Sequence, residues 1–305
     1  MGNQGRAGRS MRPRVARTVL GTLVLGSVAL FWGCSQAMSP EQQAQAESWG
    51  QWRAEQEAQV KDPQRSFLNI RDAVYLRPQQ QVGLDPSTPA AQIRWHKQAS
   101  MPLTLHHNGQ DASVEWGDQQ RTLSAGETLA LNDNLFVTVG TLYDQGLRAF
   151  VRDRHHPKVA EFEGFEFFDY NPDARVMAQF VAQTPEPVMF QTIQGLKNRF
   201  YRVGKVAFDW QGQAVTLSAY HSSGKAPYRS LLLFFKDASN GDTTYGGGRE
   251  LVLELPDGVA QSFAIDFNYT INFYCARSTF WNCPVLKDPA LTVAVEAGEQ
   301  LPADY

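Results

Sequence analysis

One loop of the sequence concentrates residue types that bind or convert polar ligands. An apolar run at residues 231–235 leads into residues 237–249, which contain two Asp, an Asn, four Gly, a Tyr and Arg249. Consecutive glycines allow close approach to the backbone, and an arginine binds a carboxylate through two parallel hydrogen bonds. The loop therefore indicates a site for an anionic or hydroxyl-rich ligand. The alternative is a long hairpin loop in which Arg249 pairs with an Asp.

A later strand end is expected to lie next to this loop and to complete the site. Asp266 and Asn268 close that strand, and Asn272 follows it. Arg249 could then orient a ligand beside ionised carboxylates. The candidate ligand-binding residues are Asp237, Thr244, Tyr245, Arg249, Asp266, Asn268 and Asn272. A hydrolase could use Asp237 and Asp266 as acid and base, whereas a buried ion-pair network that joins loop to strand is the structural alternative.

Several other chemistries lack their signatures. The six His show no His-Glu-x-x-His spacing, and there is no Gly-x-Ser-x-Gly elbow, phosphate loop or dinucleotide fingerprint. The sequence thus predicts neither a metal nor a cofactor. The first 34 residues hold five of the 28 basic side chains and no acidic one. Residues 35–305 therefore carry 23 basic and 31 acidic side chains. This balance argues against nucleic-acid binding.

The first 38 residues have the pattern of an export signal. Three Arg precede an apolar run at residues 18–33, which is shorter than the roughly 20 residues that span a bilayer. Cys34 follows this run where a bacterial lipoprotein signal places the cysteine that becomes acylated, although two bulky aromatic residues stand before Gly33. The alternatives are cleavage after Ala37 and an uncleaved anchor. We expect an exported envelope protein, lipid-anchored to the membrane at Cys34 or soluble in the periplasm.

The elements that must position the loop follow this signal. Residues 39–65 are predicted to form an N-terminal helical segment, with Ser39 as cap, a proline in the first turn and Gln42 three residues after the cap. Its helix is expected to run to about Val60, and Asp62-Pro63 to end it. Short alternating runs separated by turn residues then indicate antiparallel sheets. The sequence predicts a mainly β protein, in which a helix precedes two packed β units, at residues 66–157 and 158–305.

The two β units differ in what they resemble. Residues 82–86 and the turn at Asn108-Gly109 make the first unit, a small sandwich, similar to a forkhead-associated domain. It lacks the Gly-Arg and Ser-x-x-His residues that read phosphothreonine, so no phosphopeptide binding is expected. The second is a sandwich or an open barrel. The predicted strands cover residues 103–106, 112–116, 135–139, 147–151, 175–181, 188–193, 199–210, 214–220, 231–235, 251–255, 263–267 and 291–295.

Cysteine usage is consistent with export. If Cys34 is acylated or removed, Cys275 and Cys283 remain, and an oxidising compartment favours a disulfide between them. Two buried thiols are the alternative.

Three segments together carry a family resemblance: residues 235–249, 265–268 and 297–299. They are similar to the FxDATSGxxTYGxGR motif, the LDFN strand end and the closing AGE of the DUF1684 family of bacterial and archaeal proteins, whose activity is not agreed. The similar region spans about residues 49–300. The family's Asn-Pro-Pro-Cys is replaced by residues 272–275, which read Asn-Phe-Tyr-Cys. The resemblance implies an envelope protein, and we expect a binding or structural module that recognises a polar ligand such as a glycan.

Overall fold

The computed structural model describes residues 37–97, 100–109, 111–142, 146–287 and 291–302. Residues 38–305 form one compact unit, and Cys34 lies outside the described residues. As the sequence predicts, the described part is mainly β, with antiparallel sheets and one long N-terminal helix. No helix in it is long and apolar enough to cross a membrane.

Helix α1 (Pro40–Lys61) begins where the capping residues predict it. The Ser39 hydroxyl accepts a hydrogen bond from the Gln42 amide at 3.2 Å, and the Gln42 side chain accepts one from the Ser39 amide at 2.8 Å. This reciprocal pair satisfies amides that the first helical turn leaves without partners. The helix ends at Lys61, within one residue of the predicted end, because Asp62 precedes a proline, which disfavours helical backbone at that position.

Two four-stranded sheets form the small sandwich. The first has the order β1 (Ile70–Leu76), β8 (Leu147–Asp153), β7 (Leu135–Thr141), β6 (Thr128–Ala130), and the second β2 (Gln81–Leu84), β3 (Leu103–His107), β4 (Ala112–Trp116), β5 (Gln119–Leu123). Alternate apolar side chains of both sheets, among them Leu105 and Val137, enclose one core. This arrangement is consistent with the predicted sandwich.

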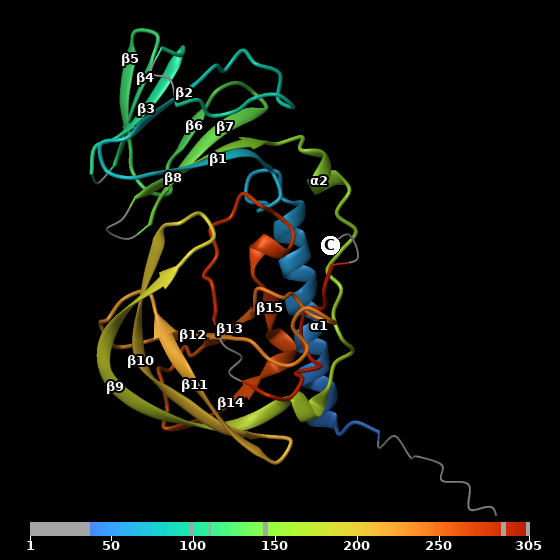
Figure 1. Cartoon of the computed structure of the whole chain (residues 1–305). Coiled ribbons are helices and arrows are strands. Elements are labelled where there is room, and N and C mark those ends of the chain that lie inside the picture. The colour runs from blue at the N-terminus through green and yellow to red at the C-terminus, as the bar shows by residue number, and fades with distance from the viewer. Residues whose placement is uncertain (1–36, 98–99, 110, 143–145, 288–290, 303–305) are drawn as a thin grey trace, which may run out of the picture. The chain divides into compact units, whose positions relative to one another are not determined.

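One seven-stranded antiparallel sheet builds the rest of the unit. Its order is β14 (Ser262–Asp266), β9 (Arg175–Gln191), β10 (Lys197–Trp210), β11 (Gln213–His221), β12 (Ser230–Phe235), β13 (Arg249–Glu254), β15 (Ile271–Asn272). Short helices are α2 (Pro157–Ala160), η2 (Pro172–Ala174), η3 (Phe267–Tyr269) and η4 (Tyr274–Ala276). The long strands β9 and β10 curve around the sheet, and α1 lies beside β13, β14 and β15 (Figure 1).

Strand β9 is continuous where the sequence predicts two strands with a break. It pairs with β10 along most of its length, but with β14 only over residues 175–179. Its prolines, at residues 185 and 187, therefore stand where the other edge of β9 has no partner among the described residues, and an edge tolerates a missing amide donor. Gly204 on β10 lies at a register shift, where a Cβ would come within 2.5 Å of the Phe180 ring.

The predicted strand at residues 291–295 is absent from the structure. The Val295 amide instead donates to the Asp237 carboxylate at 3.2 Å, and the Val295 carbonyl accepts from Arg249 at 2.9 Å. The Leu291 amide and the Val293 carbonyl bond to the backbone of residues 236 and 238, so the segment follows the loop and does not join the sheet ladder.

Candidate functional site

Arg249 and Asp237 form an ion pair closed to solvent. Arg249 Nη2 lies 2.7 Å from Asp237 Oδ2, and both side chains are 0% exposed. The guanidinium also donates to the carbonyls of Ala297 at 2.7 Å and Val295 at 2.9 Å. Asp237 Oδ1 accepts from the amides of Ser239 and Val295. The pair therefore joins the loop to the C-terminal segment, as expected for a buried ion-pair network. Neither side chain is exposed to a ligand.

The predicted loop residues Thr244 and Tyr245 belong to the same network. Thr244 Oγ1 lies 2.8 Å from the Ser239 hydroxyl and accepts from Asn240 Nδ2 at 3.0 Å. Asn240 also donates to the Tyr245 carbonyl at 2.8 Å, and the Tyr245 amide donates to Asn272 Oδ1 at 3.3 Å. These bonds fix the loop against β15 and position Asn272.

Asp266 and Asn268 have a separate role. Asp266 Oδ1 accepts from the Asn268 amide at 3.0 Å and from its side-chain amide at 2.7 Å, so that it caps η3. The Asn268 carbonyl accepts from Trp49 Nε1 at 2.8 Å, which attaches α1 to this turn. No hydrogen bond or ion pair among the described residues joins Asp266 to Asp237 or Arg249. The expected acid and base pair facing a common pocket is not assembled.

A cavity of about 140 Å³ lies between α1, β15 and residues 273–281. Six aromatic side chains line it: Phe67, Phe165, Phe167, Phe273, Tyr274 and Trp281. The Tyr274 and Phe67 rings stack with centroids 4.5 Å apart and planes 9° apart, and Trp281 meets Tyr274 at 5.0 Å. Tyr274 is 41% exposed, so part of its ring is open to solvent. Asn272 is the member of the predicted set that lines this cavity.

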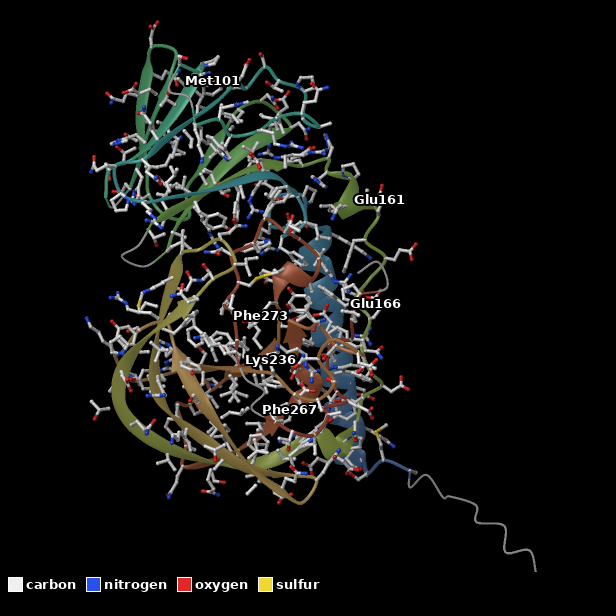
Figure 2. The ribbon with its side chains drawn as sticks, in the orientation of Figure 1. Met101, Glu161, Glu166, Lys236, Phe267 and Phe273 are labelled. Atoms are coloured by element: carbon white, nitrogen blue, oxygen red, sulfur yellow. A yellow bond between two sulfur atoms is a disulfide. The ribbon has the colours of Figure 1, made fainter. Side chains whose placement is uncertain are left out.

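A buried carboxyl and an arginine form the polar wall of the cavity. Glu299 Oε2 accepts from the Asn272 amide at 2.8 Å, and its Oε1 lies 3.4 Å from Arg277 Nε. Arg277 Nη2 lies 2.5 Å from the carboxylate of Glu166. Figure 2 labels Glu166 and Phe273 on opposite sides of α1 in the view. Burial raises the pKa of Glu299 to about 7, although Arg277 acts in the opposite direction.

Gly298 puts Glu299 in this position. Its φ is +82°, and a Cβ at residue 298 would lie 2.5 Å from the Thr270 carbonyl oxygen. Only glycine therefore allows the chain to turn under β15 and to deliver the carboxyl to the cavity.

Glu250 is a second unusual carboxyl near the cavity. It pairs with Ile271 across β13 and β15, which places the two side chains on one face, and Ile271 lines the cavity. The half-buried Glu250 side chain forms no hydrogen bond or ion pair with the described residues. Burial raises its pKa to about 7. Burial and the charges of Glu250 and Glu299 also raise the pKa of Tyr274, so both carboxyls lie near its phenol.

The raised pKa of Glu250 predicts a pH dependence of stability. Between its ordinary value of 4.5 and about 7, the folded chain holds a proton that the unfolded chain has released. Raising the pH through this window therefore destabilises the wild type relative to a Glu250→Gln variant. Below about pH 4.5 and above about pH 7, the difference in unfolding free energy between the two proteins no longer changes with pH. Urea unfolding of both proteins from pH 4 to pH 8 checks this, and a difference that does not vary with pH would contradict it.

The expected disulfide is present. Cys275 and Cys283 are bonded, and the loop that they close carries Arg277 and Trp281 of the cavity wall. The bond thus limits the movement of the segment that bounds the site.

The arrangement suits binding more than bond cleavage. Aromatic faces can stack on the apolar face of a ring, and Glu299 holds Arg277 so that the Nη1 group, which its two ion pairs leave free, can donate hydrogen bonds to hydroxyl groups. In the described part of the chain, no group of three or more His, Cys, Asp or Glu side chains is placed to hold a metal ion. Such a cavity, apolar with a few convergent polar groups, is typical of small-molecule sites.

A family model described as "Protein of unknown function (DUF1684)" matches residues 160–300. The chain belongs to the DUF1684 family. The solution NMR structure of an uncharacterized protein from Haloarcula marismortui is 32% identical in sequence, and the match covers 48% of this chain and 80% of that one, with a TM-score of 0.41. No curated protein matches the chain.

The DUF1684 match contains most, but not all, of the cavity. Residues 273–281 and Glu299 lie within it, whereas Phe67 and the α1 residues that line the cavity precede it. The helix thus adds a wall from outside the matched region of DUF1684.

Sequence reasoning missed the ionisable residues of the cavity. Glu299 closes the AGE run that resembles DUF1684, and Tyr274 stands in the segment that departs from the family's Asn-Pro-Pro-Cys. Those two signals could have pointed to the site. Arg277 carries no such signal, because only the disulfide loop brings it there.

Proposed function

We propose that this protein binds a small hydroxyl-rich ligand, such as one sugar unit of an envelope glycan, in the aromatic cavity. The observation that carries the proposal is the combination of stacked rings with the Glu299 and Arg277 pair in one partly open cavity. Its volume of about 140 Å³ resembles the roughly 150 Å³ of a cavity that holds one six-membered aromatic ring. Ring faces and charged hydrogen-bonding groups together match the two surfaces of a sugar.

Hydrolysis by Asp237 and Asp266 is not the function that we propose. It requires Asp237 to face the ligand, but the Asp237 side chain is 0% exposed and both of its oxygens accept hydrogen bonds within the protein. A carboxyl held in this way can neither donate a proton to a ligand nor accept one from it.

Tyr274 offers the direct test of binding. A Tyr274→Ala variant is expected to bind a free hexose or N-acetylhexosamine about tenfold more weakly, because it removes a stacking face. Tyr274→Phe keeps the ring and should keep most of the affinity. Isothermal titration with a panel of monosaccharides measures both.

A matched control is Tyr220→Ala. Tyr220 also stacks on a phenylalanine, Phe234, at 5.6 Å, but it does not line the cavity. We expect this variant to bind as the wild type does. Failure of the wild type to bind any sugar of the panel would refute the proposed function.

We further propose that the protein is exported and is held in the envelope by an acylated Cys34, or is released as a soluble form by cleavage after Ala37. The Arg-rich start and the apolar run support this proposal, as does the Cys275–Cys283 bond, since disulfides persist in oxidising compartments. Mass spectrometry of the mature protein should find a diacylated or triacylated cysteine, or Met38, at the amino terminus. An intact Met1 terminus would contradict export with processing.

A further inference from the structure

A second hollow adjoins the aromatic cavity along α1. It has a volume of about 510 Å³, and Gln56, Gln59 and Ile271 line both spaces. The two spaces therefore adjoin at these three residues. We call the two spaces together the α1 groove.

The second hollow lies where the large sheet is open. β13 pairs with β15 only at Arg249 and Glu250, so the edge of β13 from residue 251 onward has no strand partner among the described residues. β14 is the last strand at the other end of the sheet order. Residues 251–254 of β13 and the following Leu255, with Ala264 and Asp266 of β14, line the hollow from its two sides, and α1 contributes Trp52.

The far end of the groove repeats the chemistry of the aromatic cavity. The rings of Trp52 and Tyr269 meet with centroids 4.9 Å apart, and the Asp266 carboxyl lines the same hollow. Burial raises the pKa of Asp266. Aromatic faces beside a carboxyl thus stand at both ends.

The middle of the groove presents polar groups without partners. The side-chain amides of Gln56 and Gln59 form no hydrogen bond with the described residues. Each carries both donors and an acceptor, which matches the hydroxyl groups of a sugar.

We propose that the α1 groove binds a linear oligosaccharide of about three or more units, with one unit in the aromatic cavity and the following units along α1 toward Trp52 and Tyr269. The inference rests on the proposed function and extends it from a single sugar to a chain. The aromatic cavity alone holds about one ring, whereas a hollow of about 510 Å³ falls in the range of roughly 300–1,000 Å³ of ordinary ligand sites.

The test is the dependence of affinity on chain length. Isothermal titration would compare mono-, di-, tri- and tetrasaccharides of two series, β-1,4-linked N-acetylglucosamine and β-1,4-linked glucose. We expect the wild type to bind the trisaccharide of at least one series about tenfold more tightly than its monosaccharide, since a second aromatic contact is added.

Two variants locate this gain. Val252 is 39% exposed and, of the two spaces, lines only the second hollow. Val252→Trp should therefore fill that hollow and abolish the rise in affinity with chain length. Monosaccharide binding should be unchanged. Asp266→Asn keeps an oxygen that can cap η3 and should reduce the gain in part. Val181→Trp, at a site that is 58% exposed on β9 and does not line the groove, is the matched control.

The outcomes separate the two proposals. The oligosaccharide proposal would be overturned if monosaccharides bound but affinity did not rise with chain length, or if the rise in affinity survived Val252→Trp. The aromatic cavity would then remain as a site for a single sugar. Absence of any sugar binding would overturn both. Tight binding of an extended peptide, blocked by Val252→Trp, would show instead that the free edge of β13 accepts a strand, and this too would overturn the oligosaccharide proposal.

Discussion

An Arg249→Ala variant is expected to lose about 3–5 kcal/mol of unfolding free energy, because Asp237 would stay buried without its counter-ion. The carbonyls of Val295 and Ala297 would lose their donor at the same time, so the segment before Gly298 would be loosened. Urea unfolding of the variant and the wild type measures the difference.

Arg202→Ala is the matched control for this experiment. Arg202 and Glu186 also form an ion pair, with 2.5 Å between Nη2 and Oε2, but their side chains are 34% and 61% exposed. An exposed pair contributes less than about 1 kcal/mol. If Arg249→Ala and Arg202→Ala proved equally mild, the buried pair could not have the structural role that its geometry indicates.

Removal of the disulfide is the second change with a large expected effect. A Cys275→Ala and Cys283→Ala double variant should lose roughly 2–3 kcal/mol of unfolding free energy, because the unfolded chain regains the entropy of a short closed loop. The loop also carries Arg277 and Trp281, so sugar binding should weaken together with stability.

Reductant provides the control for the double variant. Wild-type protein in a thiol reductant should approach the stability of the double variant, whereas the double variant should not respond. A wild type that unfolds at the same urea concentration with and without reductant, while its thiols titrate as free, would contradict the expected contribution.

Local signals in the sequence predict much of the fold. Ser39 and Gln42 fix the start of α1 because both capping bonds form within four residues. The alternating runs likewise predict most strands, since each pattern needs only one buried face. Residues 291–295 have the same pattern but remain outside the ladder, because Val295 bonds to the Arg249 and Asp237 side chains, while Leu291 and Val293 bond to the loop backbone at residues 236 and 238. A pattern of side chains does not reveal which groups will satisfy the backbone.

The candidate site is harder to predict because its accessibility is a tertiary property. The sequence places Arg249 and an Asp of the same loop together, and the structure joins them, but it encloses the pair. The open cavity instead uses Tyr274, Glu299 and Phe67, which are far apart in the chain. Their meeting depends on the turn at Gly298 and on the docking of α1.

The incomplete pairing of β13 has a consequence for the behaviour of the protein in solution. Unpaired strand edges recruit strands of other molecules and so promote aggregation. Trp52, Gln56 and Gln59 of α1 border this edge, and the acidic Glu254 stands on it. Besides its contribution to ligand contacts, α1 therefore shields this edge from the strands of other molecules, and loss of the helix would lower solubility as well as stability.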